Sequence, residues 1–211
     1  MAKLSLEQLE AKYELMSEFE KQEFSNGASV IAGIDEAGRG PLAGPVVVAS
    51  VVLDPNNPIL GLDDSKKLSE KKREMLFDEV KKKALAYSII ERDAKFIDEV
   101  NILEATKDAM REASRTLGIM PDVLLIDAVD LKGVDCKVVP IIKGDAKSNS
   151  IAAASILAKV HRDRLMKEYD CEYPGYGFAK HKGYGTKEHY AAIHELGISP
   201  IHRMTFLKKM H

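Results

Sequence analysis

The hydrophobic and polar positions of this chain follow two different periods. Short apolar runs rich in β-branched residues predict buried strands, and they lie at 31–34, 46–53, 86–92, 123–126 and 137–142. Apolar residues spaced three and four apart among charged ones predict helices, and they lie at 4–24, 70–84, 97–117, 150–169 and 187–196. This order of elements predicts an α/β fold in which helices flank a mixed β-sheet.

The two ends of the chain differ from the middle. Asn26-Gly27 ends the first helical pattern, so we divide the chain into an N-terminal helical extension, 1–27, and a main domain, 28–211. Near the other end, 173–185 reads YPGYGFAKHKGYG, and its glycines and aromatic residues predict no regular structure. Together with the last helix and the tail, it is expected to form an irregular, partly helical cap at about 170–211.

Composition places the chain among soluble globular proteins. Its 211 residues are 45% hydrophobic and 30% charged, which suits one domain with a substantial core. The N-terminus mixes charges throughout, unlike a signal or transit peptide, and no apolar run approaches the ~20 residues of a membrane helix. Cys136 and Cys171 form no C-x-x-C pair. We therefore expect two free thiols, a cytoplasmic location, no membrane partner and a monomer.

The net charge of −2 is unevenly distributed. From Lys137 onward there are thirteen Lys and Arg against seven Asp and Glu, so this part carries +6 and the preceding part −8. A basic C-terminal third is typical of a surface that binds a polyanion. It is equally consistent with a solvated face that binds nothing, and charge alone does not decide between them.

Four carboxylates follow predicted strands. Asp35 and Glu36 come after 31–34, Asp127 follows 123–126, and Asp145 follows 137–142. In open α/β sheets, sites gather at the carboxyl ends of strands. Carboxylates meeting there could share two divalent cations, Mg²⁺ or Mn²⁺ rather than zinc, and so support phosphoryl displacement. A single Asp in such a place is more often a turn residue, and spacing alone leaves both interpretations open.

Glycines follow the first carboxylate pair. Gly38-x-Gly40-x-x-x-Gly44 loosely resembles a dinucleotide-binding fingerprint, but Pro45 and a strand follow where that fingerprint needs a helix. No P-loop sequence is present either, so nucleotide-cofactor binding is not expected. Gly38 and Gly40 instead offer backbone that a ligand could approach closely. The six histidines lack metal-ligand spacing, which argues against a zinc site.

Longer motifs extend this picture. The chain reads DEAGRGPLAGPVVV at 35–48, DSKKLS at 64–69, LLID at 124–127, GDAKSNSIAAASILAKVHRDR at 144–164, YPGYGFAKHKGYGTKEH at 173–189 and SPIHRMTF at 199–206. In these blocks it resembles ribonuclease HII, the bacterial type 2 ribonuclease H. The resemblance begins after residue 30 and leaves the 4–24 helix outside it, with no expected role in function.

The resemblance implies a ribonuclease H-like fold, with 28–211 as the catalytic domain. It implies hydrolysis of the RNA strand of RNA/DNA hybrids and incision 5′ to single ribonucleotides in duplex DNA, through two Mg²⁺ or Mn²⁺ ions. The products would carry 5′-phosphate and 3′-hydroxyl ends. The partners would be RNA/DNA hybrid and DNA containing ribonucleotides. Two rivals remain, a type 3 ribonuclease H and a non-catalytic nucleic-acid binder on the same fold.

The resemblance also assigns residues. The catalytic and metal-binding positions of the family fall on Asp35, Glu36, Asp127 and Asp145. Its substrate-binding positions include Gly38, Arg39 and Gly40, whose backbone would sense the ribose 2′-hydroxyl, and Tyr184, which would stack near the following deoxyribose. We interpret Lys66 and Lys67 as phosphate contacts, and expect at least one of Lys159, Arg162 and Arg164 to face the substrate backbone. The chain departs from the family pattern at Ala128, His161 and Met204-Thr205 without losing any of these carboxylates.

Overall fold

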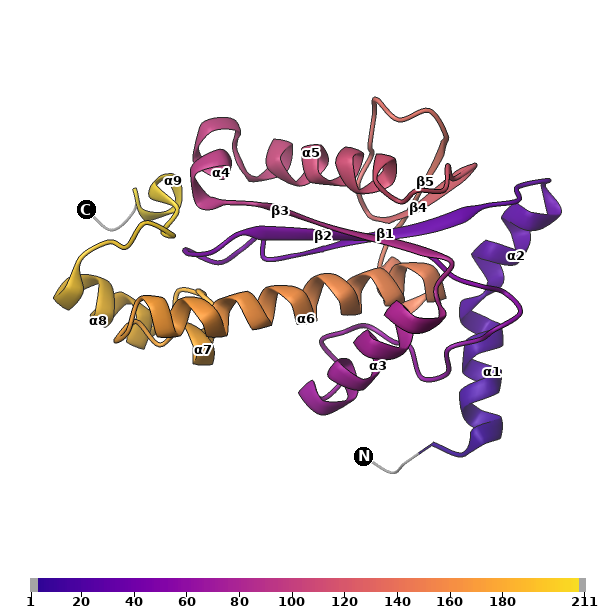
Figure 1. Cartoon of the computed structure of the whole chain (residues 1–211), viewed down its shortest axis with the longest axis horizontal. Coiled ribbons are helices and arrows are strands. Elements are labelled where there is room, and N and C mark those ends of the chain that lie inside the picture. The colour runs from indigo at the N-terminus through magenta and orange to yellow at the C-terminus, as the bar shows by residue number, and fades with distance from the viewer. Residues whose placement is uncertain (1–3, 209–211) are drawn as a thin grey trace.

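A central five-stranded sheet separates two layers of helices (Figure 1). The computed structural model describes residues 4–208. The strands are β1 (Ile31–Ala37), β2 (Val46–Val52), β3 (Ala86–Arg92), β4 (Val123–Asp127) and β5 (Lys137–Ile141). The helices are α1 (Leu6–Met16), α2 (Glu18–Ser25), α3 (Glu70–Lys83), α4 (Ala94–Val100), α5 (Ile102–Arg115), the 3-10 turn η1 (Gly144–Ala146), α6 (Asn149–Glu172), α7 (Phe178–His181), α8 (Lys187–Leu196) and α9 (Met204–Leu207).

The sheet is mixed, as the sequence predicts. Its strand order is β3-β2-β1-β4-β5, with β1–β2 and β2–β3 antiparallel and β1–β4 and β4–β5 parallel. Ile34 pairs with Ile126 across β1 and β4, so the residues that follow both strands meet at one edge of the sheet. The expectation that the first strand ends at Ile34 is wrong. It runs on to Ala37 because its antiparallel pairing with β2 continues through Ala37 and Val47.

Helix α6 lies along one face of β1 and β2. Its first half is small and apolar, and the alanines between 152 and 158 are completely buried. The approach is so close that a Cβ added to Gly33 would lie 2.1 Å from the backbone carbon of Ser150. Helices α4 and α5 cover the opposite face, where Ala109, Met110 and Ala113 pack with the apolar residues of β1 and β4.

Three predicted elements differ in the structure. The single helix at 4–24 is two helices, α1 and α2, which meet at Ser17, whose hydroxyl donates to the Tyr13 carbonyl, a bond that often bends helices. The helix at 97–117 is likewise divided into α4 and α5 at Asn101, whose φ is +72° and whose side chain caps α5. The irregular stretch at 173–185 contains the short helix α7.

The helices nearest the two termini pack at opposite ends of the sheet. Helices α1 and α2 lie at one end and α7, α8 and α9 at the other (Figure 1). The C-terminal helices enclose a hydrophobic cluster of their own around Phe178, Met166 and Leu42. Between residues 4 and 208 no helix combines the length and apolar character needed to cross a membrane.

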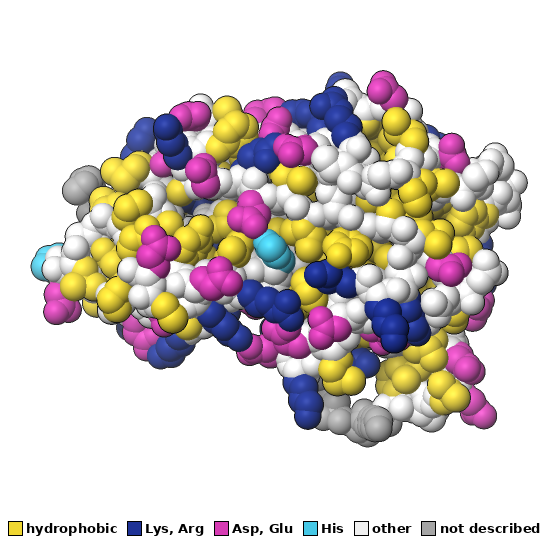
Figure 2. Space-filling view, viewed as in Figure 1, with side chains coloured by type: hydrophobic (Ala, Val, Ile, Leu, Met, Phe, Trp, Pro, Cys, Tyr) yellow, Lys and Arg dark blue, Asp and Glu magenta, His cyan; other side chains and the backbone are white. Residues whose placement is uncertain are grey.

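Basic and acidic side chains mix on the surface. On the face drawn in Figure 2, Lys and Arg side chains gather along α6 and α3, with acidic side chains placed among them. The charge asymmetry of the sequence therefore does not produce a continuous basic surface on this face.

Candidate active site

Two acids lie side by side on β1. Asp35 is buried, and its Oδ1 accepts the backbone N–H of Glu36 at 2.8 Å. Burial raises the pKa of Asp35 well above its usual value, and the charge of Glu36 adds to the shift, whereas a hydrogen bond from Ser155 opposes it. The pKa of Glu36 is also raised, mainly by burial, although Arg39 works against this. Both carboxyls are therefore difficult to ionise together without a cation.

Asp127 joins this pair to the fourth acid. It ends β4 beside Asp35, and its Oδ1 accepts the backbone N–H of Gly144 at 2.8 Å. That bond holds the η1 turn, on which Asp145 is buried. Burial raises the pKa of Asp145 to about 6, and the charges of Asp64 and Asp127 add to the effect. The four predicted carboxylates thus come together and act on one another electrostatically.

Asp64 is a fifth acid that the sequence analysis did not assign. Its side chain hydrogen-bonds that of Asp145 and contributes to its raised pKa. Asp64 also accepts the backbone N–H of Lys66 at 2.9 Å, which fixes the loop before α3. The one available signal was its place at the start of the DSKKLS motif, because acidic turn residues are common and periodicity does not separate them.

The donor set suits a hard divalent cation. It consists of carboxylates, three of which, Asp35, Glu36 and Asp145, have pKa values raised by burial and by neighbouring acids. Glu36 Oε2 is buried without a hydrogen-bond partner in the described part of the chain. Within residues 4–208, however, no three His, Cys, Asp or Glu side chains are already arranged to hold an ion.

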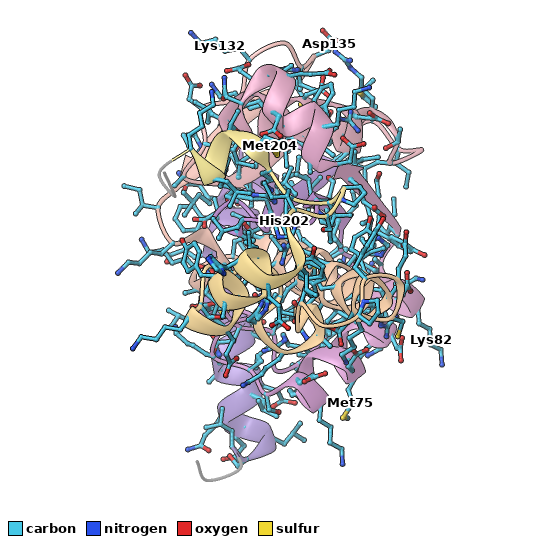
Figure 3. All side chains as sticks on the ribbon, turned by 90° about the vertical axis from the view of Figure 1, so that its left-hand side faces the viewer. Met75, Lys82, Lys132, Asp135, His202 and Met204 are labelled. Carbon is cyan, nitrogen blue, oxygen red and sulfur yellow. The ribbon has the colours of Figure 1, made fainter. Side chains whose placement is uncertain are left out.

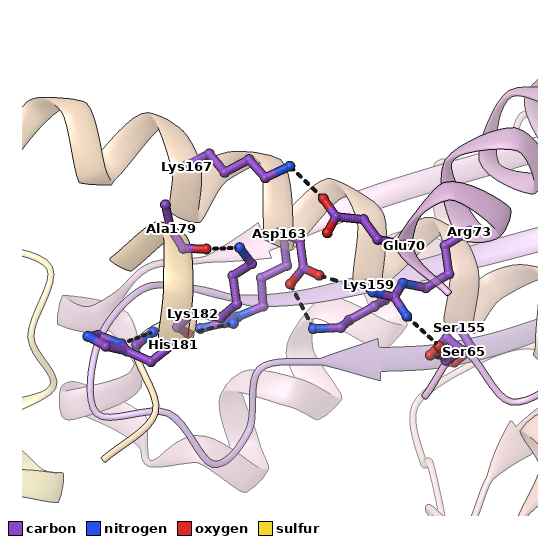
Figure 4. A network of polar contacts seen from close by, with 12 residues as sticks. Ser65, Glu70, Arg73, Ser155, Lys159, Asp163, Lys167, Ala179, His181 and Lys182 are labelled. Carbon is purple, nitrogen blue, oxygen red and sulfur yellow. Dashed lines mark hydrogen bonds and ion pairs between the residues drawn. The ribbon is translucent and has the colours of Figure 1, made fainter. Parts of the chain in front are cut away.

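A polar cleft opens beside the acids. It has a volume of about 270 Å³ and is lined by residues from β1, the glycine loop, the loop before α3, α6 and the C-terminal cap. These residues include Asp35, Glu36, Gly38, Arg39, Gly40, Ser65, Lys66, Ser155, Lys159 and Tyr184. The Ser65 and Ser155 hydroxyls, both from lining residues, lie 2.9 Å apart, and Figure 4 shows the two side chains together. The cleft is thus a candidate substrate surface that lies directly beside the carboxylates.

The two predicted phosphate-contacting lysines lie in different surroundings. Lys66 lines the cleft, where burial lowers its pKa but Asp145, Asp64 and Asp35 outweigh that effect and leave the pKa raised. It therefore carries a firm positive charge beside the acids. Lys67 is not among the residues that line the cleft. It is exposed, and its Nζ lies 3.8 Å from Asp63.

Of the three α6 cations among which a substrate contact is expected, Lys159 lines the cleft. Its Nζ is 2.7 Å from Asp163, which also lies 3.9 Å from Arg73 (Figure 4). Arg164 pairs with Glu74 outside the cleft. Arg162 borders the cleft, but its guanidinium is buried and donates to the backbone carbonyls of Pro45, Lys182 and Ala43 at 2.9–3.1 Å. Arg162 is therefore a structural support of the loop.

The glycine loop is shaped from inside the protein. Gly38 is buried with φ of +96°, and a Cβ there would lie 2.1 Å from Arg162 Nε. Close packing and backbone conformation require glycine at this position, and Gly38 also lines the cleft. Gly40 is exposed, and a Cβ there would meet only the Tyr184 ring, at 3.6 Å. Half-exposed Tyr184 thus lies beside Gly40, and both line the cleft.

Comparison with known proteins identifies relatives of this chain. The family model described as "Ribonuclease HII" matches residues 32–209. The chain is 61% identical to a ribonuclease HII of Ruminiclostridium cellulolyticum, covering 92% of this chain and 76% of that one. It is 54% identical to one of Acetivibrio thermocellus, covering 98% of this chain and 80% of that one. Among solved structures, the ribonuclease H2 of Pyrococcus horikoshii OT3 superposes with a TM-score of 0.72 at 31% identity, over 86% of this chain and 97% of that one.

The chain belongs to the ribonuclease HII family. It is accordingly a hydrolase of the endoribonuclease class, and its fold is the ribonuclease H-like one predicted from the sequence motifs. Ribonuclease HIII structures superpose as well, but at 18–20% identity they show a common fold and no more. The family match therefore favours type 2 over type 3.

The N-terminal helices are part of this likeness, which corrects the expectation that they lie outside it. The match to the Acetivibrio thermocellus ribonuclease HII covers 98% of the chain and so includes most of α1 and α2. Buried Glu20 of α2 accepts from the Ser148 hydroxyl at 2.6 Å and from the Ser150 backbone N–H at 3.0 Å. Glu23 pairs with Lys137 of β5 at 2.7 Å. The extension thus supports the start of α6, directly after the turn that carries Asp145.

Proposed function

We propose that this ribonuclease HII hydrolyses the RNA strand of RNA/DNA hybrids and incises 5′ to single ribonucleotides in duplex DNA, leaving 5′-phosphate and 3′-hydroxyl ends. One observation carries the proposal. The carboxylates of β1, β4 and η1 come together beside a cleft that is also lined by Gly40 and the adjacent ring of Tyr184. Chemistry and selectivity would thus share one cavity.

Asp35, Glu36, Asp127 and Asp145 would hold two Mg²⁺ or Mn²⁺ ions. The raised pKa values of Asp35, Glu36 and Asp145 and the unpartnered Glu36 Oε2 support a cation among these side chains. A ribonuclease HIII of the same fold was solved in complex with Mn²⁺. When bound, such ions supply an activated water and stabilise the leaving oxygen of a phosphodiester.

The chain's own groups would orient the substrate. Lys66 and Lys159 place positive charge in the cleft, where phosphate oxygens would lie beside the acids. The exposed backbone of Gly40 would meet a ribose edge, and the half-exposed Tyr184 ring beside it would offer a flat surface to the neighbouring sugar. Backbone groups that hydrogen-bond a 2′-hydroxyl stay unpaired on DNA, and that loss is what rejects a deoxyribonucleotide.

The test is a duplex that contains one ribonucleotide, incubated in Mg²⁺ and then in Mn²⁺, with an all-DNA duplex as control. We expect a single cut on the 5′ side of the ribonucleotide and none in the all-DNA duplex. Asp35→Asn and Asp127→Asn should abolish cleavage with the fold retained by circular dichroism. Asp135→Asn is the matched control, since exposed Asp135, labelled in Figure 3, lies in the loop between β4 and β5 and not among the residues that line the cleft. Near-normal turnover by either active-site variant would overturn the assignment.

A binding measurement complements the cleavage assay. Mn²⁺ that binds the folded state raises Tm by mass action. The wild type and Asp135→Asn should show the same rise, and Asp127→Asn a much smaller one. Equal rises in all three proteins would place the ion elsewhere.

A further inference from the structure

The connection between α8 and α9 is hydrogen-bonded to the glycine loop and, through His189, to the backbone of Tyr184. His202 lies on this connection in Figure 3. The segment pairs with the loop that follows β1: Gly44 N–H donates to the Ile201 carbonyl and Arg203 N–H to the Leu42 carbonyl, both at 2.8 Å. Its two neighbouring side chains, His202 and Arg203, are buried. His202 extends toward the Tyr184 segment and Arg203 toward the glycine loop.

Arg203 extends to the glycine loop. Its guanidinium has no exposed surface and donates to the carbonyls of Gly38 at 2.6 Å, Arg39 at 3.0 Å and Gly44 at 2.8 Å. A planar fork with several donors can satisfy several carbonyls at once, which a lysine cannot do. Both ends of the loop are therefore tied to one side chain.

His202 is linked to the Tyr184 backbone through a second histidine, His189. The Ser199 backbone N–H donates to His202 Nδ1 at 3.0 Å, so the His202 proton lies on Nε2. This Nε2 is 3.0 Å from His189 Nε2, which must then accept, so His189 carries its proton on Nδ1. His189 Nδ1 donates in turn to the Tyr184 carbonyl at 2.9 Å. The hydrogen bonds thus run in a single direction from Ser199 to Tyr184.

A third histidine supports the same loop. The His181 ring stacks on His189 with centroids 4.4 Å apart. Its Nδ1 accepts the Gly183 N–H at 3.2 Å and its Nε2 lies 2.7 Å from the Tyr176 carbonyl. All three rings can hold their partners only as neutral imidazoles with defined tautomers. The Tyr184 backbone therefore has little freedom to move relative to the connection.

We propose that His202 and Arg203 form a strut that sets the spacing between the Gly38–Gly40 loop and Tyr184, and so determines how well the enzyme selects a ribonucleotide followed by DNA. Both are positioning residues, since neither reaches the cleft. The inference rests on the proposed function of the cleft, in which the glycine loop and Tyr184 hold successive sugars. It adds that their separation is fixed by one dipeptide from a part of the chain outside the catalytic sheet.

The first test compares two substrates, a duplex with a single ribonucleotide followed by DNA and the matching continuous RNA/DNA hybrid. In His202→Asn the amide oxygen can still accept from Ser199, but the side chain is too short to reach His189. We expect the ratio of kcat/KM between the two substrates to fall about tenfold, equivalent to about 1.4 kcal/mol. The loss should be in kcat on the single-ribonucleotide duplex. His202→Gln, which places an N–H near the Nε2 position, should restore most of the preference.

Matched controls separate positioning from stability. His194→Asn makes the same change at an exposed histidine of α8 and should leave the ratio at the wild-type value. A merely structural role of His202 would reduce the activity on both substrates equally, and that result would overturn the strut. If Tyr184→Ala loses the preference while His202→Asn keeps it, the strut is wrong and the proposed function stands.

A second test needs no activity. Nitrogen-15 NMR of the imidazole rings at pH 7 should show His202 protonated on Nε2 and His189 on Nδ1, with both neutral. Loss of the His189 Nδ1–H signature in His202→Asn, and its return in His202→Gln, would support the relay. The opposite tautomers in the wild type would overturn it, even for a protein that cleaved neither substrate and so failed the proposed function.

Discussion

The two ends of the active site are held by buried charges of opposite sign. At the N-terminal end, the Glu20 carboxylate accepts from the Ser148 hydroxyl and the Ser150 N–H at the start of α6. At the C-terminal end, the guanidiniums of Arg162 and Arg203 donate to carbonyls of the loop after β1. Each charge meets the backbone group that its region leaves unpaired, because a helix start exposes N–H groups and this loop exposes carbonyls.

The difference between these ends corresponds to different tasks. The acidic end supports a short turn that carries one carboxylate, Asp145, and a single acceptor suffices there. The basic end shapes a loop of several carbonyls around Gly38, which requires donors arranged in a fork. We therefore expect removal of a cation to cost more than removal of the acid.

The largest effect should come from Arg203→Met. Three loop carbonyls then lose buried donors, and each unsatisfied carbonyl costs about 1–3 kcal/mol, so the free energy of unfolding should fall by about 3–5 kcal/mol. Urea unfolding followed by circular dichroism measures it. Arg39→Met is the matched control, because the exposed Arg39 side chain makes one contact at 3.5 Å with Glu36. Similar losses in both variants would contradict the role of burial.

Glu20→Ala should rank second. The Ser148 hydroxyl and Ser150 N–H lose their acceptor, and the free energy of unfolding should fall by about 2 kcal/mol. Glu18→Ala, at an exposed position of the same helix, should change it by less than about 0.5 kcal/mol. A loss from Glu20→Ala that exceeded the loss from Arg203→Met would reverse the comparison.

The two ends should also respond differently to acid. Burial lowers the pKa of His189 from 6.5 to about 4, so the unfolded chain binds more protons between these values and the stability from neutral His189 is lost as pH falls from 6.5 toward 4. Asp145 has the opposite sign, since its pKa is raised from 3.8 to about 6 and its ionisation costs stability as pH rises through this range.

This difference can be measured in chelator-treated protein by urea unfolding at pH 7 and pH 5. The stability advantage of the wild type over His189→Gln should shrink at pH 5. The stability of Asp145→Asn relative to the wild type should be higher at pH 7 than at pH 5. Parallel changes in the two variants would contradict the opposite signs.

The smallest effect should come from Glu70→Gln. Glu70 and Lys167 form an exposed ion pair at 2.7 Å (Figure 4), and such pairs contribute about 0–1 kcal/mol. The free energy of unfolding should therefore change by less than about 0.5 kcal/mol, even at low salt. A loss as large as that of Glu20→Ala would show that burial does not distinguish the charges of this protein.

Local pattern was enough to predict most of the fold. Strand runs and helical spacing located all five strands and the main helices, and the motifs identified the family. The failures lie at Ser17 and Asn101, where a helix changes direction within a continuous apolar pattern. Spacing records which face is buried and does not record a change in helix axis, which depends on the elements packed against it.

The site divides in the same way. Sequence alone selected Asp35, Glu36, Asp127 and Asp145 as candidates, because each follows a predicted strand, and the parallel pairing of β1 and β4 in the structure brings two of those strand ends together. It did not distinguish Arg162 and Arg203 from surface cations, or His189 and His202 from exposed histidines. Burial and hydrogen-bond partners depend on contacts between distant segments. Arg203 and Gly38, for example, are more than 100 residues apart in the chain. Motifs carry the chemistry locally, whereas the geometry that positions it arises only when distant backbone groups meet in the folded chain.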